Sequence, residues 1–126
     1  MVCLDYNLNR NMKLLQSLTE EEKDKCEFLI NAICPPGCPH RKEHYRLNSL
    51  FSLTYGQQYQ MEQCMIKHDA LHPATLHYHN NLTPDDIYNV YAPMGFKYFK
   101  IEGRTWDRVD LIATYAYYMV KPEHQY

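Results

Sequence analysis

Residues 28–44 read Phe-Leu-Ile-Asn-Ala-Ile-Cys-Pro-Pro-Gly-Cys-Pro-His-Arg-Lys-Glu-His. The apolar run at 28–33 is typical of a buried strand, and the residues after Pro39 follow the spacing of an amphipathic helix. Cys34 and Cys38 stand between the two. We expect Cys38 at the N-cap of the helix and Pro39 in its first turn, where the helix dipole favours thiolate. Ligands of α/β proteins bind in such loops, so this loop is a candidate for chemistry.

The strand-to-helix pattern occurs four times along the chain. Strands are predicted over residues 2–6, 26–33, 76–80 and 96–101, and the helices that follow them over 11–18, 39–54, 83–91 and 107–120. A short acidic turn with Thr19 as its cap precedes the second strand. Alternation of this kind predicts a parallel sheet with right-handed crossovers. We therefore expect a single α/β domain over residues 1–126, built from four parallel strand–helix units.

Length and composition narrow the class of protein. The chain has 126 residues, which suits one domain, and a net charge of −2. That charge does not indicate a nucleic-acid partner, although Arg41, Lys42 and Arg46 form a local basic cluster. No apolar run reaches membrane-spanning length, and residues 1–7 lack the apolar block of a signal peptide. With five cysteines, an odd number, we expect a reduced, cytoplasmic protein.

The cysteines are the best candidates for metal ligands. Cys64 lies downstream of Cys34 and Cys38 in a stretch that carries histidines. Soft thiolates favour zinc or an iron–sulfur cluster over magnesium or calcium. We therefore predict that these three cysteines converge on one zinc ion or iron–sulfur cluster. Cysteines without any bound metal remain the alternative, and the fourth ligand would be His40, His68 or a substrate.

A second candidate loop is Phe99-Lys-Ile-Glu-Gly-Arg-Thr105, which closes a strand and precedes a helix. Glu102 and Arg104 would project at the carboxyl ends of the strands, and Gly103 would permit a tight turn. The planar guanidinium of Arg104 suits an anionic ligand or an internal carboxylate such as Glu27. Glu27, Glu102 and Arg104 are therefore the predicted substrate-binding residues. A plain turn with two solvated charges is the alternative.

The order of these segments resembles a known family. A strand that carries Glu27 and ends at Cys34 is followed by Gly95-Phe-Lys-Tyr-Phe-Lys-Ile-Glu-Gly-Arg104 and a tyrosine-rich helix. This arrangement resembles the collagenase-like peptidase family of undefined catalytic type, whose relatives include proteins similar to iron–sulfur hydroxylases of RNA bases and of ubiquinone precursors. The resemblance implies a TIM-like barrel, with this chain in its C-terminal half. It also implies a peptidase-like or an iron–sulfur hydroxylase-like activity.

Four strand–helix units make half of such a barrel, because a closed one needs eight. We therefore expect a fragment, one half of a homodimer, or an open sheet with exposed edges. The last helix is apolar on several sides, which also indicates a homo-oligomer or a complementary half-barrel as partner. The second hypothesis for function is a non-catalytic protein-binding module on the same scaffold. Its working part would be surfaces formed by the 12 tyrosines of the chain.

Overall fold

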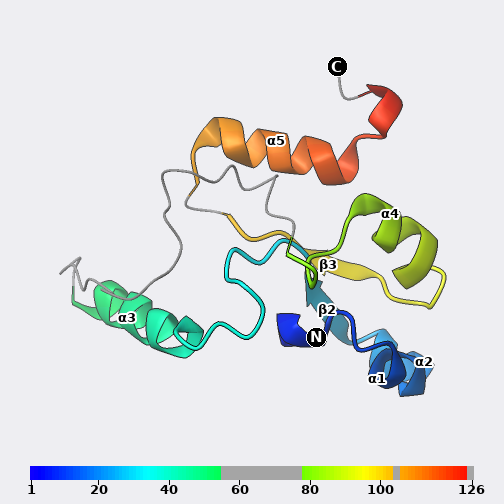
Figure 1. Ribbon diagram of the computed structural model, residues 1–126, viewed down its shortest axis with the longest axis horizontal. Coiled ribbons are helices and arrows are strands. Elements are labelled where there is room, and N and C mark those ends of the chain that lie inside the picture. Colours follow the sequence, from blue (N-terminus) through cyan, green and yellow to red (C-terminus); the bar gives the residue numbers. More distant parts are fainter. Residues whose placement is uncertain (55–77, 104–105, 125–126) are drawn as a thin grey trace. The chain divides into compact units, whose positions relative to one another are not determined.

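The structure is a computed structural model that describes residues 1–54, 78–103 and 106–124, drawn in colour in Figure 1. The chain forms two compact units. The first unit comprises Met1–Pro36 and His72–Tyr126, and the second comprises Gly37–Leu71. The sheet and the hydrophobic core belong to the first unit.

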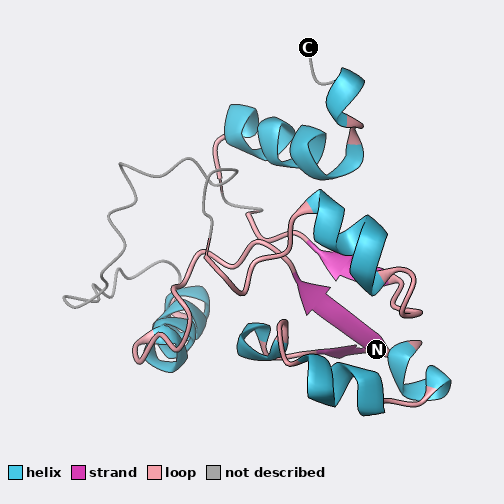
Figure 2. Cartoon of the chain, turned by 45° about the vertical axis from the view of Figure 1, so that its right-hand side comes forward, coloured by secondary structure: helices cyan, strands magenta, loops and turns pink. Residues whose placement is uncertain are grey.

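The sheet has three described strands, the arrows in Figure 2. These are β1 (Val2–Cys3), β2 (Cys26–Leu29) and β3 (Tyr98–Lys100), and they lie in the order β1-β2-β3. Both pairings are parallel, with Glu27 opposite Cys3 on one side and Tyr98 on the other. The prediction of a mixed α/β fold with a parallel sheet is therefore confirmed.

Most of the described helices begin where the sequence predicts. The first unit holds η1 (Tyr6–Leu8), α1 (Met12–Ser17), α2 (Glu20–Lys23), α4 (Pro84–Asp86) with the π-helical η4 (Ile87–Tyr91), α5 (Arg108–Met119) and η5 (Pro122–His124). Thr19 and Thr83 each form a capping box at the start of α2 and α4. Asp107 caps α5, because its side chain accepts a hydrogen bond from Val109 N. None of the helices in the described part of the chain is long and apolar enough to cross a membrane.

The second unit contains α3 (Arg41–Leu53), which starts later than predicted. Its N-cap is His40, whose side chain makes no capping hydrogen bond, so the expectation that Cys38 caps this helix is wrong. The backbone carbonyl oxygen of Cys38 instead accepts a hydrogen bond from Arg41 N at 3.4 Å, which forms a turn ahead of the helix. A thiol is a weak hydrogen-bond acceptor, whereas N-caps favour side-chain oxygens.

The strand predicted over residues 76–80 is absent from the portion that the structure describes. Residues 76 and 77 lie outside the described residues, and 78–80 belong to a turn in which Asn81 N donates to Tyr78 O at 2.9 Å. Moreover, β2 pairs directly with β3, which leaves no position between them for a further strand. The four predicted strand–helix units are accordingly not confirmed.

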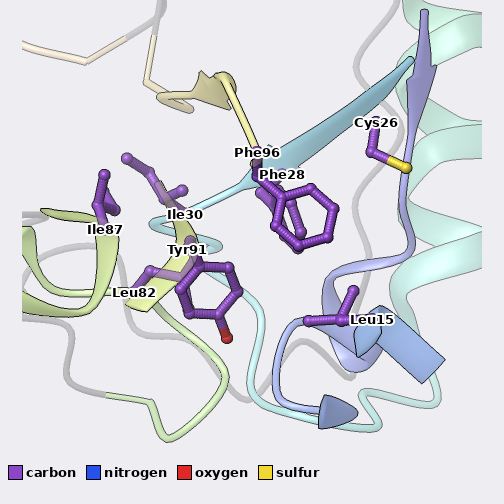
Figure 3. Packing of buried hydrophobic residues seen from close by; sticks show 8 residues of the cluster. All are labelled: Leu15, Cys26, Phe28, Ile30, Leu82, Ile87, Tyr91 and Phe96. Atoms are coloured by element: carbon purple, nitrogen blue, oxygen red, sulfur yellow. The ribbon is translucent and has the colours of Figure 1, made fainter. Parts of the chain in front are cut away.

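Phe28 lies at the centre of the hydrophobic core (Figure 3). Its ring meets Tyr91 and Phe96 edge to face, with centroid distances of 5.2 and 4.9 Å. The other buried members of this cluster are Leu15, Cys26, Ile30, Leu82 and Ile87. Because β2 supplies the central residue, the core holds this strand firmly, and its carboxyl end becomes a fixed point for the loop that follows.

Candidate functional site at the carboxyl edge of the sheet

Beyond the last paired residues, a side chain continues the pairing of β2 with β3. Asn31 Nδ2 donates to Glu102 O at 3.0 Å, and Glu102 N donates to Asn31 Oδ1 at 2.7 Å. Asn31 is buried, with 2% of its surface exposed. The amide thus satisfies both backbone groups of Glu102, as a further strand residue would. This explains why β2 ends at Leu29 although the sequence is apolar as far as Ile33.

The carboxylate of Glu102 turns toward the residues that follow β2, which we call the β2 loop (residues 30–35). Glu102 Oε2 accepts a hydrogen bond from Ile33 N at 3.3 Å. Ile33 is the residue immediately before Cys34. The two candidate loops of the sequence, one after β2 and one after β3, are therefore in direct contact through Glu102.

Groups from other segments bind the rest of the β2 loop. Asn81 Nδ2 donates to Ala32 O at 3.1 Å, and the Tyr6 hydroxyl donates to Pro35 O at 2.8 Å. Ile30 O accepts from Leu82 N at 2.9 Å and from the Tyr118 hydroxyl at 3.3 Å. Burial raises the pKa of Tyr118, so this hydroxyl stays protonated and available as a donor. The β2 loop is thus held by η1, by residues 81–82, by Glu102 and by α5.

Two further buried asparagines connect the carboxyl end of β2 with η1, the short helix that follows β1. Asn9 Nδ2 donates to Leu29 O at 2.8 Å and to Asn80 O at 2.9 Å, while Asn80 Nδ2 donates to Tyr6 O at 3.3 Å. The hydroxyl of Tyr91 donates to Asn9 O, and burial raises the pKa of this phenol. These hydrogen bonds therefore hold the end of β2, η1 and the turn at Asn80 together through the protein's own groups.

The ion pair between Arg10 and Asp86 also stabilises the carboxyl edge of the sheet. Arg10 holds both oxygens of Asp86, with Nη1–Oδ1 at 2.9 Å and Nη2–Oδ2 at 2.7 Å. Its Nε donates to His79 O at 2.9 Å, and Nη2 donates to Asn81 O at 2.8 Å. The hydrogen bond from Arg10 lowers the pKa of Asp86 to about 2. Arg10 thus ties the start of α4 to the turn that supplies Asn80 and Asn81.

Of the three predicted metal ligands, Cys34 is the one that the described residues place in this site. It is buried, with 4% of its surface exposed, within the β2 loop. Cys38 is half-buried in the second compact unit, and Cys64 lies outside the described residues. Among the described residues, no group of three or more histidine, cysteine, aspartate or glutamate side chains could hold a metal ion. Because Cys64 is not among them, convergence of the three cysteines stays a prediction.

The structure describes two of the three predicted substrate-binding residues, Glu27 and Glu102. Glu102 lies at the carboxyl edge, as expected, and is half-buried. Glu27 lies within β2, half-buried and in register with Tyr98 of β3. Arg104 lies outside the described residues, so its pairing with Glu27 stays a prediction.

Sequence reasoning missed the asparagines Asn9, Asn31, Asn80 and Asn81, all of which are buried. Asparagine is common in turns, and its type alone does not distinguish a turn from a buried clamp. The available signal is context, because Asn31 stands inside the apolar run Leu-Ile-Asn-Ala-Ile. A polar residue in such a run must have its hydrogen bonds satisfied within the fold.

Comparison of the chain with protein-family models, with curated proteins and with solved structures finds no match. The chemistry available to the site therefore has to be judged from its own groups. At the carboxyl edge, the described residues bring together a buried thiol, a carboxylate and neutral amides. Thiolate and carboxylate are metal ligands, whereas the amide N–H groups of the asparagines already donate to backbone carbonyls.

Proposed function

We propose that the chain is a metal- or iron–sulfur-binding enzyme, or half of one, with its centre at the carboxyl edge of the parallel sheet. Cys34, Cys38 and Cys64 would hold zinc or an iron–sulfur cluster. The observation that carries the proposal is the hydrogen bond from Ile33 N to Glu102 Oε2, which sets a carboxylate beside the backbone that leads into Cys34. When bound, the metal centre would supply Lewis-acid or electron-transfer chemistry.

The donor set supports this choice of metal. Thiolates bind zinc and iron in preference to magnesium or calcium. Cys34 is shielded from water, which suits a metal-bound thiolate better than an exposed redox thiol. Glu27, Glu102 and Arg104 would face the substrate, and Arg104 would pair with an anionic group. A cytoplasmic location, where thiols stay reduced, fits the same proposal.

We also propose that the three strands are a consecutive part of a TIM-like barrel. They are parallel, and their order in the sheet equals their order in the sequence. A barrel adds each strand beside the previous one, whereas doubly wound sheets reverse direction at a switch point. Such a barrel would be completed by a second copy or by a complementary half-barrel.

The outer face of α5 supports a second candidate function, a non-catalytic protein-binding module. Val109, Ile112 and Met119 are 70, 59 and 69% exposed. Exposed apolar side chains at helical spacing mark partner surfaces. In this alternative the cysteines would be structural or simply inherited with the scaffold.

Cysteine variants decide between the two functions. The full chain would be purified without oxygen, and the metal and sulfide content of Cys34→Ser, Cys38→Ser and Cys64→Ser would be compared with that of the native chain. We expect each change to lower the bound metal, because each removes one thiolate ligand. The exposed Cys3→Ser is the matched control and should retain the native metal content. Equal metal content in all four variants and the native chain would overturn the proposal.

A further inference from the structure

We propose that Glu102 is a positioning residue, whose carboxylate fixes the backbone of the β2 loop next to Cys34. The proposal rests on the proposed function for its purpose, since a fixed loop serves catalysis only if Cys34 is a metal ligand. It assigns one oxygen of Glu102 to the protein's own backbone. The residue was expected from the sequence only as a substrate-binding group.

The geometry forms a closed link between the two strand ends. Asn31 holds the backbone of Glu102 by two hydrogen bonds, of 2.7 and 3.0 Å. The carboxylate then returns to Ile33, two residues after Asn31, at 3.3 Å. Each strand end thus fixes the other, and the Glu102 side chain starts from a backbone that is itself held.

The described backbone after β3 offers Ile33 N no acceptor, because the chain turns directly after Glu102. Gly103 has a φ of +133°, and Trp106 N donates to Gly103 O at 2.9 Å, so the chain turns directly after Glu102. In the parallel ladder Ile30 N donates to Lys100 O at 3.1 Å, so the next donor in register would be Ala32 N and its acceptor Glu102 O, but that carbonyl accepts from Asn31 Nδ2. Ile33 N lies outside this register, and the carboxylate of Glu102 supplies its hydrogen-bond acceptor.

Precise support of this kind is what a ligand-bearing loop requires. Metal ligands are held to within about 0.5 Å by hydrogen bonds from residues that do not touch the metal. The hydrogen-bonded N–H belongs to the peptide group between Ala32 and Ile33, and only the Cα atom of Ile33 separates that group from the peptide group that leads into Cys34. Asn81 binds Ala32 O, the carbonyl of that same peptide group, and Tyr6 binds Pro35 O farther along the loop. Without the Glu102 carboxylate, the Ile33 N–H would lose its hydrogen-bond acceptor.

Amide hydrogen exchange of the full chain, measured at Ile33 by NMR, tests the inference without any bound metal. Glu102→Asp keeps the charge but is too short to reach Ile33 N. Glu102→Gln keeps an oxygen acceptor at the native length. Glu123→Gln, an exposed glutamate in η5, is the matched control. We expect Ile33 exchange to speed up by at least about fivefold in Glu102→Asp and to stay within about twofold in Glu102→Gln and in the control.

Unchanged exchange at Ile33 in Glu102→Asp would overturn the inference, as would equal acceleration in Glu102→Gln. A general loss of stability would accelerate exchange at core amides such as Phe28 to the same extent, and that result would also count against a positioning role. Metal content is measured on the same samples. A native chain that binds no metal contradicts the proposed function, whereas the exchange result at Ile33 still decides the role of Glu102.

Discussion

The side chain of Asn31 pairs with the backbone of Glu102 through two hydrogen bonds, of 2.7 and 3.0 Å, and so joins the carboxyl ends of β2 and β3. The pairing resembles one more step of the parallel ladder, made by an amide side chain in place of a peptide group. Because Glu102 also reaches Ile33, this one asparagine sets the starting geometry of both candidate loops.

Replacing Asn31 by alanine should lower the free energy of unfolding by about 1–3 kcal/mol, because the Glu102 backbone groups lose their partners in a largely buried place. Urea unfolding, followed by circular dichroism, measures the change. Asn89→Ala is the matched control, since Asn89 is exposed on η4, and it should stay within about 0.5 kcal/mol of the native chain. Equal stabilities of the two variants would contradict the clamp.

The Arg10–Asp86 ion pair should make the free energy of unfolding depend on pH in the acid range. Asp86 has a pKa of about 2 in the folded chain, below its ordinary value of 3.8, so folding favours the charged carboxylate. Its contribution is fully present above about pH 4 and disappears as pH falls toward 2. We expect Asp86→Asn to remove about 1–2 kcal/mol of stability at pH 6 and to flatten the loss between pH 4 and 2.

Urea unfolding at pH 6, 4 and 2.5 measures this effect. Asp85→Asn is the control, because Asp85 is the exposed neighbour in the first turn of α4. It should follow the pH dependence of the native chain. An Asp86→Asn variant that loses stability with acid as steeply as Asp85→Asn would show that this pair does not govern the acid response.

Gly103 should not tolerate a side chain. Its φ of +133° is rare for other residues, and an added Cβ would lie against Cε3, Cδ2 and Cζ3 of the Trp106 ring. Gly103→Ala should therefore cost about 2–4 kcal/mol, from backbone strain and displacement of the ring. The fluorescence of Trp106, the one tryptophan of the chain, should shift as well.

Gly37→Ala is the comparison for Gly103. Gly37 also has a positive φ, of +66°, but no atom lies within 4 Å of an added Cβ. Gly37→Ala should therefore lower the free energy of unfolding by only about 1 kcal/mol, because the left-handed backbone is its one source of strain. Similar costs at both positions would mean that the Trp106 ring does not constrain Gly103.

The outer face of α5 should drive association. Ile112→Glu and Met119→Glu place charges where 59 and 69% of the side-chain surface is exposed, so the folded chain should tolerate them. Light scattering at micromolar concentration should report an oligomer for the native chain and a 15.1 kDa monomer for both variants. Leu53→Glu, on exposed α3, is the control and should still associate. A native chain that is monomeric throughout would contradict this prediction.

Local rules predicted much of the fold. Thr19, Thr83 and Asp107 begin helices within one residue of the expected starts, because side-chain capping is encoded nearby in sequence. The apolar run from Cys26 predicted the central strand β2, because the apolar pattern of a buried strand is also local in sequence. Its end at Leu29 was not predictable, because it depends on Asn31 meeting Glu102, 71 residues away.

The strand predicted over residues 76–80 is absent from its described part, residues 78–80, for a related reason. The local pattern of residues 76–80 fits a strand. However, the side chains of Asn80 and Asn81 donate hydrogen bonds to the backbone carbonyls of Tyr6 and Ala32. Asparagine competes with regular backbone pairing in this way, and the outcome depends on which segments lie nearby. Prediction of the candidate site from sequence placed Cys34 and Glu102 at one edge of the sheet, but it did not foresee that Glu102 would bind the loop itself.

The central proposal is a thiolate-bound metal centre at the carboxyl edge of the sheet. Its most direct test is elemental analysis, with an absorption spectrum, of the native full chain purified without oxygen. The account predicts at least about one zinc ion per chain, or iron with acid-labile sulfide and a brown colour. Colourless protein without zinc or iron would contradict it.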